Sequence, residues 1–208
     1  MSINTEHAKQ KLLTIAGLVR KDGTTAPGWS DTTGPYGHRP NKDHPVWLTV
    51  TVAAYIKETG DVGILKTMLP YLKDRWIRGW ETDPEYHGGP STDGEGTLFE
   101  HLWRNLDFTY TDVGDKGLPL IGHADWNDAI DAAGIKLRGQ SVWLAQALVR
   151  SLKILAELAQ LIGEDAKASE LLARAQTMTD RVNQHAWDGA WYTRGFTDDG
   201  TVYGSHVN

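Results

Sequence analysis

The 208-residue chain contains no cysteine, which excludes disulfide bonds and thiolate metal ligands. It also has no run of lysine and arginine, and its formal net charge is −6, so neither nucleic acid nor an anionic membrane is an expected partner. No apolar stretch approaches the roughly 18 uncharged residues that a membrane-spanning helix needs. The polar N-terminus has no secretory hydrophobic region. We therefore expect a cytoplasmic protein.

Several catalytic signatures are absent as well. The eight histidines include no H-x-x-x-H or H-E-x-x-H spacing, so metal catalysis has no sequence support and neither a metal nor a cofactor is expected. There is no G-x-S-x-G, no P-loop, and no G-x-G-x-x-G after a strand. Acyl transfer, nucleotide hydrolysis and hydride transfer therefore lack their usual motifs.

Phenylalanine is scarce, while tryptophan is not: three phenylalanines stand against nine tryptophans and seven tyrosines. Rings with a polar edge suit a polar cleft such as a sugar site. Core and interface packing nevertheless explains most individual tryptophans in proteins. The composition therefore favours a sugar site without locating it.

Apolar residues recur at helical spacing along most of the chain. This periodicity predicts helices over 6–20, 43–60, 62–73, 97–110, 139–163 and 165–187, and a short hairpin around the Asp188-Gly189 turn. The connecting loops are long, polar and rich in glycine, and strand signal is weak. About six helices joined by such loops predict an all-α protein, either an α/α barrel whose loops carry the site or a helical solenoid.

One polar segment stands out, LPLIGHADWNDAID at 118–131. Asp125 and Asp128 are three residues apart, so they share a face of a helical turn, and Trp126 lies between them in sequence. Two nearby carboxyl groups beside a ring can have pKa values that are pushed apart, so that one stays protonated. A protonated carboxyl is what the oxygen of a breaking glycosidic bond needs, and an indole can stack on the sugar.

Other interpretations of this segment compete. A calcium loop fails because Ile130 and Lys136 stand where an EF-hand has glycine and glutamate. A helix N-cap formed by Asp125 or Asn127 remains open, as does a solvated polar turn. The residues alone do not decide which aspartate would act as an acid.

The segment resembles the motif G-L-P-L-x-G-x-G/A-D-W-N-D of the disaccharide phosphorylases of glycoside hydrolase family 94. Further stretches agree with this family in order and spacing: DHPVWLTVTVAAYIKETGD at 43–61, TLFEHLWRNLDFT at 97–109, GQSVWLAQAL at 139–148 and HAWDGAWYTRGFTDDGTVYGS at 185–205. The resemblance implies an (α/α)6 barrel. Residues 1–208 are then expected to be the central part of this catalytic domain, a partial barrel of about six helices, without the family's N-terminal β-sandwich and the C-terminal remainder of the barrel.

The resemblance also implies a reaction, the inverting phosphorolysis of a β-linked, cellobiose-like disaccharide or oligosaccharide to an α-sugar 1-phosphate, with inorganic phosphate as co-substrate. Asp128 matches the family's general acid and Trp126 its sugar-contacting tryptophan. Five further positions are expected to shape the site or to bind sugar: Asp125, Asn127, His123, Asp43 and His44.

Two other functions are compatible with the same residues. An inverting α/α-barrel hydrolase would use water and would need a second carboxylate as base, for which Asp43 or Asp125 could serve. A non-catalytic carbohydrate-binding helical fragment is the other alternative, because the family's R-D-x-x-Q-D sugar-binding segment and its phosphate-binding residues fall outside 1–208. A partial barrel exposes apolar helix faces, which a second copy of the chain could cover in a homodimer.

Overall fold

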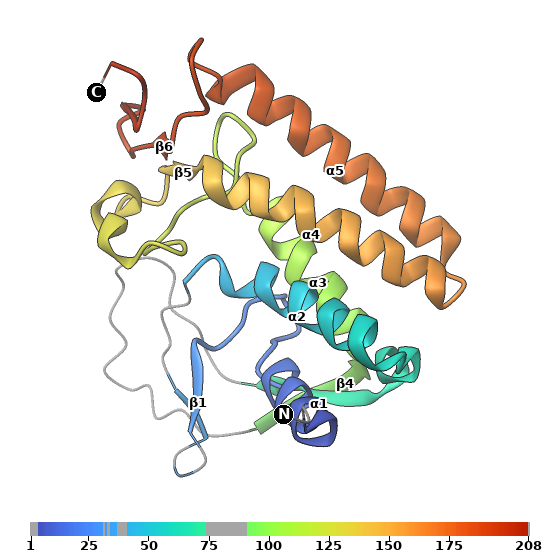
Figure 1. The fold of residues 1–208 in the computed structure, drawn as a ribbon. Helices are drawn as coiled ribbons and strands as arrows, with labels where there is room; N and C mark the ends of the chain where they lie inside the picture. Colours follow the sequence, from blue (N-terminus) through green and yellow to red (C-terminus); the bar gives the residue numbers. More distant parts are fainter. Residues whose placement is uncertain (1–3, 31, 33, 37–40, 74–90, 208) are drawn as a thin grey trace.

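The computed structural model describes residues 4–30, 32, 34–36, 41–73 and 91–207. Within them, most of the ordered backbone is helical, so the mostly helical class predicted from periodicity is confirmed (Figure 1). The α-helices are α1 (Thr5–Ala16), α2 (His44–Thr59), α3 (Leu98–Thr111), α4 (Val142–Leu161) and α5 (Asp165–Ala186), with short 3-10 helices η1 (Val62–Lys66) and η2 (Asp128–Gly134). The (α/α)6 barrel itself stays a prediction.

Short antiparallel strands correct the all-α prediction. The described residues form three small sheets: β1 (Gly28–Ser30) with β2 (Gly34–Tyr36), β3 (Met68–Lys73) with β4 (Ser91–Thr97), and β5 (Gln140–Ser141), β6 (Gly195–Phe196) and β7 (Val202–Tyr203) in that order.

The predicted helix over 62–73 is wrong beyond Lys66, where β3 follows η1. Pro70 has no backbone N–H to give to a helix. Leu69 and Tyr71 are buried while Met68 and Pro70 are exposed, which is the two-residue alternation of a strand. The hairpin expected around Asp188-Gly189 is present only as a turn, closed by a single bridge between Trp187 and Tyr192.

Helix α4 is the centre of the fold. It lies between α2 and α5 in Figure 1 and contacts α2, α3 and α5. Its buried residues face more than one neighbour, as is typical of a helix that is apolar on more than one side. The fully buried leucines of α4 are Leu144, Leu148, Leu152 and Leu155. Each such side chain stabilises the fold by about 1.5–3 kcal/mol relative to an exposed one.

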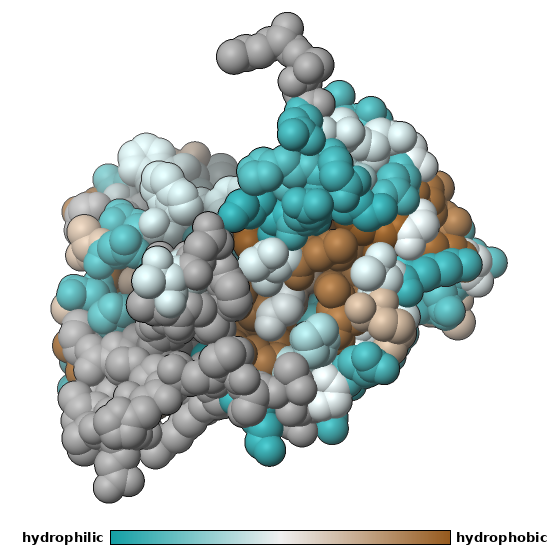
Figure 2. Space-filling view, turned by 90° about the horizontal axis from the view of Figure 1, so that it is seen from below, coloured by the Kyte–Doolittle hydropathy of each residue, from teal (hydrophilic) through white to brown (hydrophobic). Residues whose placement is uncertain are grey.

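The described surface is not uniformly polar. Figure 2 shows, from below, an apolar patch between hydrophilic side chains. Ile15 of α1 and Met68 of β3, two elements on the lower side of Figure 1, are 44% and 51% exposed. Apolar patches of this kind are typical of surfaces that meet another segment or chain. No helix in the described part of the chain has both the length and the apolar content to cross a membrane.

Candidate functional site

The segment before α2 runs alongside the D-W-N-D motif, although the two are about eighty residues apart in sequence. The backbone N–H of Lys42 donates to the carbonyl of Ala124 at 2.8 Å, and the ammonium group of Lys42 forms an ion pair with Asp112. Gly122, at a φ of +57°, lets the Lys42 side chain pass close to the motif, because a Cβ there would lie 3.3 Å from it. The two segments are therefore fixed to each other.

Asp128 is exposed at the first residue of η2. Its Oδ1 accepts a hydrogen bond from the side-chain amide of Asn41 at 2.7 Å, across the junction of the two segments. Its Oδ2 has no hydrogen-bond partner among the residues described. The carboxylate is thus oriented through one oxygen and open through the other.

Asn127 caps η2, because its side-chain oxygen accepts a hydrogen bond from the backbone N–H of Ala129 at 3.0 Å. This confirms the N-cap interpretation for Asn127.

Asp125 is fully buried, and both of its carboxylate oxygens are engaged. Oδ1 accepts from the Arg194 guanidinium at 2.6 Å and from the backbone N–H of Asn127 at 3.0 Å, and Oδ2 accepts from the Ser141 hydroxyl at 2.5 Å. Ser141 is also the N-cap of α4, where its Oγ accepts the N–H of Leu144 at 2.9 Å. Asp125 therefore joins the motif to the start of α4 and to Arg194, the residue before β6.

Three tryptophans form a row next to the motif. Trp126 is 63% exposed, and its ring centre lies 6.1 Å from that of Trp143 with 28° between the planes. The ring centre of Trp143 also lies 6.1 Å from that of Trp47, with 46° between the planes. The indole N–H of Trp47 donates to Oδ2 of Asp43 at 2.7 Å. The exposed ring thus belongs to a packed set of indoles.

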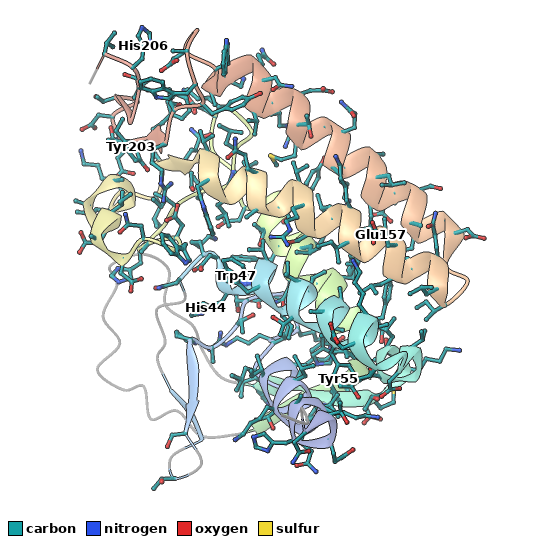
Figure 3. All side chains as sticks on the ribbon, in the orientation of Figure 1. His44, Trp47, Tyr55, Glu157, Tyr203 and His206 are labelled. Carbon is teal, nitrogen blue, oxygen red and sulfur yellow. The ribbon has the colours of Figure 1, made fainter. Side chains whose placement is uncertain are left out.

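The remaining predicted residues lie in the same two segments. Asp43 is buried, and its Oδ1 has no partner among the described residues. His44 lies beside Trp47 at the start of α2 (Figure 3), where both line a cavity of about 400 Å³ against α1. His123 is partly buried within the motif. Two other loop histidines, at positions 38 and 87, lie outside the described residues.

A partly buried tyrosine, Tyr203, adjoins the Asp125 ion pair. Burial raises the pKa of the Tyr203 hydroxyl to about 12; the positive charge of Arg194 opposes this rise and the negative charge of Asp125 adds to it. Figure 3 shows Tyr203 near β6, away from Trp47 and His44. At neutral pH this tyrosine is un-ionised, so it adds no charge to the pair.

The loop after η2 is anchored by Asp198. Its carboxylate accepts the backbone N–H groups of Lys136, Arg138 and Gly139 at 2.6, 2.8 and 2.9 Å. Burial of Asp198 acts to raise its pKa, but the three backbone hydrogen bonds outweigh burial, and the pKa lies below its ordinary value of 3.8. The C-terminal segment therefore holds the polar loop as well as the motif.

This geometry predicts an acid-sensitive loop. A carboxylate with a lowered pKa in the folded state contributes stability that is complete above the unfolded pKa and is lost as the pH falls through the folded pKa. We expect the free energy of unfolding to fall as the pH drops below about 5 and through the lowered pKa of Asp198, and Asp198→Asn to flatten this dependence. Urea unfolding followed by tryptophan fluorescence at a series of pH values measures it.

The matched control is Asp199→Asn, because the Asp199 side chain is 71% exposed and makes only exposed ion pairs. We expect this variant to keep the wild-type pH dependence. An unchanged pH dependence in Asp198→Asn would contradict the proposed anchoring.

Sequence reasoning missed four residues that build this region: Asn41, Ser141, Arg194 and Asp198. Ser141 had a readable signal, since a serine directly before an apolar helical run is an N-cap. The other three act across 59 to 87 positions of sequence, and no local pattern marks such partners. Within the described residues, no three histidine or carboxylate side chains gather as metal ligands.

The fold of this chain resembles one already known from a solved structure. It is similar to a solved GH78 family rhamnosidase of Bacillus sp. GL1, with a TM-score of 0.54 and 17% identity over 96% of this chain and 19% of that chain. At this identity the likeness concerns the fold alone. Residues 4–208 match the glycosyl hydrolase 94 superfamily, catalytic domain, and the chain belongs to this family.

Curated relatives include disaccharide phosphorylases. Solabiose phosphorylase of Paenibacillus borealis is 34% identical over 96% of this chain and 23% of its own length. Cellobionic acid phosphorylase of Neurospora crassa is 35% identical over 79% of this chain and 18% of its own length. A cyclic β-(1,2)-glucan synthase of Rhizobium meliloti is 30% identical over 97% of this chain and 7% of its own length. The chain thus spans less than a quarter of these relatives.

Proposed function

We propose that this chain supplies the acid-bearing part of an (α/α)6 catalytic barrel that performs inverting phosphorolysis of a β-linked glucoside, with Asp128 as general acid. The observation that carries the proposal is the Asp128 carboxylate, oriented by Asn41 through Oδ1 and open at Oδ2, two residues after the exposed Trp126. Membership of a family whose curated relatives include disaccharide phosphorylases supports it.

The chemistry requires one protein carboxyl. An oxygen of inorganic phosphate attacks the anomeric carbon from the face opposite the glycosidic bond, and the carbon–oxygen bond to the second sugar breaks. The leaving oxygen keeps the bonding electron pair and takes the proton from Asp128. A β-linked substrate therefore gives an α-sugar 1-phosphate, and the Asp128 carboxylate is reprotonated from solvent.

The other side chains have separate roles in this proposal. Trp126 would stack on the face of the reacting sugar, and Asn41 would hold the acid in place. His123 and His44 would contact sugar hydroxyl groups, Asp43 would hold the Trp47 indole from its buried position, and Asn127 and Asp125 would shape the loop. We propose a cellobiose-like substrate and, because the reaction uses free phosphate, a cytoplasmic location.

The hydrolase alternative finds less support. An inverting hydrolase needs a carboxylate that the attacking water can reach and that can take its proton. Both oxygens of Asp125 are occupied in a fully buried site. Asp43 is 5% exposed, and one of its oxygens accepts the Trp47 indole N–H. Neither aspartate offers an open oxygen comparable to that of Asp128.

The proposal predicts strict dependence on phosphate. Purified chain is incubated with cellobiose and related β-linked disaccharides, with and without inorganic phosphate, and products are followed by proton NMR, which distinguishes the anomers. We expect an α-sugar 1-phosphate only when phosphate is present, and synthesis of disaccharide from α-glucose 1-phosphate and glucose in the reverse direction.

Two outcomes would contradict this proposal. Sugar release that is unchanged by removal of phosphate identifies a hydrolase. Sugar binding that survives Asp128→Asn, with no turnover by the unmodified chain in either direction, identifies the non-catalytic fragment.

A further inference from the structure

We infer that the first turn of α4 sets the orientation of Trp126, with Trp143 as a positioning residue that holds the exposed indole in place through ring stacking. The inference rests on the proposed function only for its effect on sugar binding. The orientation itself is a property of this chain and can be tested separately.

Trp126 has little else to hold it. It is 63% exposed, and among the described residues its indole N–H makes no hydrogen bond. Its ring contact within the described structure is Trp143, at 6.1 Å between centres and 28° between planes, an offset-stacked arrangement. An exposed side chain without such a contact exchanges between rotamers on the nanosecond scale or faster. One face of the Trp126 indole is therefore fixed by Trp143.

Trp143 reaches this position because of how α4 begins. It lies two residues after Ser141, the N-cap, whose hydroxyl donates to Asp125 at 2.5 Å. Two neighbouring motif residues are thus held by two nearly adjacent residues of one helix: Asp125 by Ser141 and Trp126 by Trp143. A rigid helical turn contacting both fixes the loop backbone and the indole together.

The support continues behind Trp143. Its ring lies 6.1 Å from Trp47 of α2, and the indole N–H of Trp47 donates to the buried carboxylate of Asp43 at 2.7 Å. A hydrogen bond to a buried charged acceptor is stronger than one between neutral groups. The Trp47 indole is therefore held in place by Asp43, which connects Asp43 indirectly to Trp126.

The experiment compares Trp143→Ala, Trp143→Leu and Trp143→Phe in the full chain. Indole N–H signals are recorded by two-dimensional NMR on nitrogen-15-labelled protein, and the Trp126 signal is identified by its loss in Trp126→Phe. We expect the Trp126 signal to move toward that of a free indole in the alanine and leucine variants, and to stay near the wild-type position in the phenylalanine variant.

The matched control is Trp103→Ala. Trp103 is another partly buried helical tryptophan, which contacts Lys167 and Arg174 rather than the motif. This control is expected to leave the Trp126 signal unchanged. The leucine variant preserves apolar bulk, so it keeps the test decisive if the alanine variant does not fold. A Trp126 signal that is unchanged in Trp143→Leu overturns the inference.

Sugar binding is the second measurement, by titration of each variant with cellobiose in the presence of phosphate. We expect Trp143→Leu to weaken binding about two- to tenfold, and Trp143→Phe to restore it. Weakened binding that phenylalanine does not restore also overturns the inference. If the unmodified chain binds no sugar, the proposed function fails, while the NMR result still decides whether Trp143 orients Trp126.

Discussion

Replacing Asp128 by asparagine is expected to lower the rate of phosphorolysis of an alkyl-type disaccharide such as cellobiose by about 10²–10⁴-fold. Asparagine can still accept the Asn41 amide hydrogen bond, so the loop should keep its shape, but it cannot donate a proton to the leaving oxygen. Initial rates of sugar 1-phosphate formation, with unfolding measured on the same preparations, test this.

The nature of the leaving group makes the test specific. In an aryl β-glucoside the leaving group is an acidic phenol, which departs as phenolate without being protonated. If the lost function is proton donation, the rate deficit of Asp128→Asn should therefore shrink strongly on that substrate. Asp131→Asn is the matched control, since Asp131 is the other acidic residue in the first turn of η2. A deficit of equal size on both substrates would mean that Asp128 acts in some way other than as an acid.

Replacing Arg194 by methionine is expected to destabilise the chain by about 3 kcal/mol, the low end of the range for breaking a buried ion pair. The Asp125 carboxylate would stay fully buried and lose its charge partner, whereas the Arg194 side chain is itself 23% exposed. Methionine keeps the apolar length of the arginine stem, so the loss reports the charge rather than the packing. Urea unfolding at neutral pH measures the change.

The double variant separates the pair from its surroundings. Asp125→Asn combined with Arg194→Met removes both charges, so its loss of stability should be smaller than the sum of the two single losses. Arg138→Ala is the control for an exposed pair, because its side chain is 62% exposed and lies 3.6 Å from Asp199; it should cost no more than about 1 kcal/mol. Additive single losses would contradict direct coupling between Asp125 and Arg194.

The sequence predicted the elements that depend on local contacts and missed those that depend on distant ones. The helices α1 to α5 were predicted because apolar residues at three- and four-residue spacing indicate a buried helix face from local sequence alone. The strand β3 was missed because its apolar residues follow directly on those of η1 and continue an apparent helical run. The strand that pairs with it, β4, is polar and rich in glycine and gives no strand signal. The small sheets depend on pairing between distant segments, which leaves no local period.

The site divides in the same way. The motif made Asp128, Trp126 and Asn127 candidates, and a local rule for capping correctly included Asn127. The burial of Asp125 was not predictable from the motif, because it depends on Arg194, 69 residues further along the chain. The stacking of Trp126 depends equally on where the first turn of α4 lies, which is set by packing.

The bond between Asp125 and Arg194 also bears on the order in which the protein forms. Helices close through local contacts, but this ion pair and the Asp198 anchor need chain segments 59 to 69 residues apart to meet, and long loops close more slowly and at greater entropic cost. During synthesis, residues 194–198 emerge only after α5 is complete. We therefore expect the polar loop that carries Asp128 to reach its final shape after the helices around it, once residues 194–198 have been made.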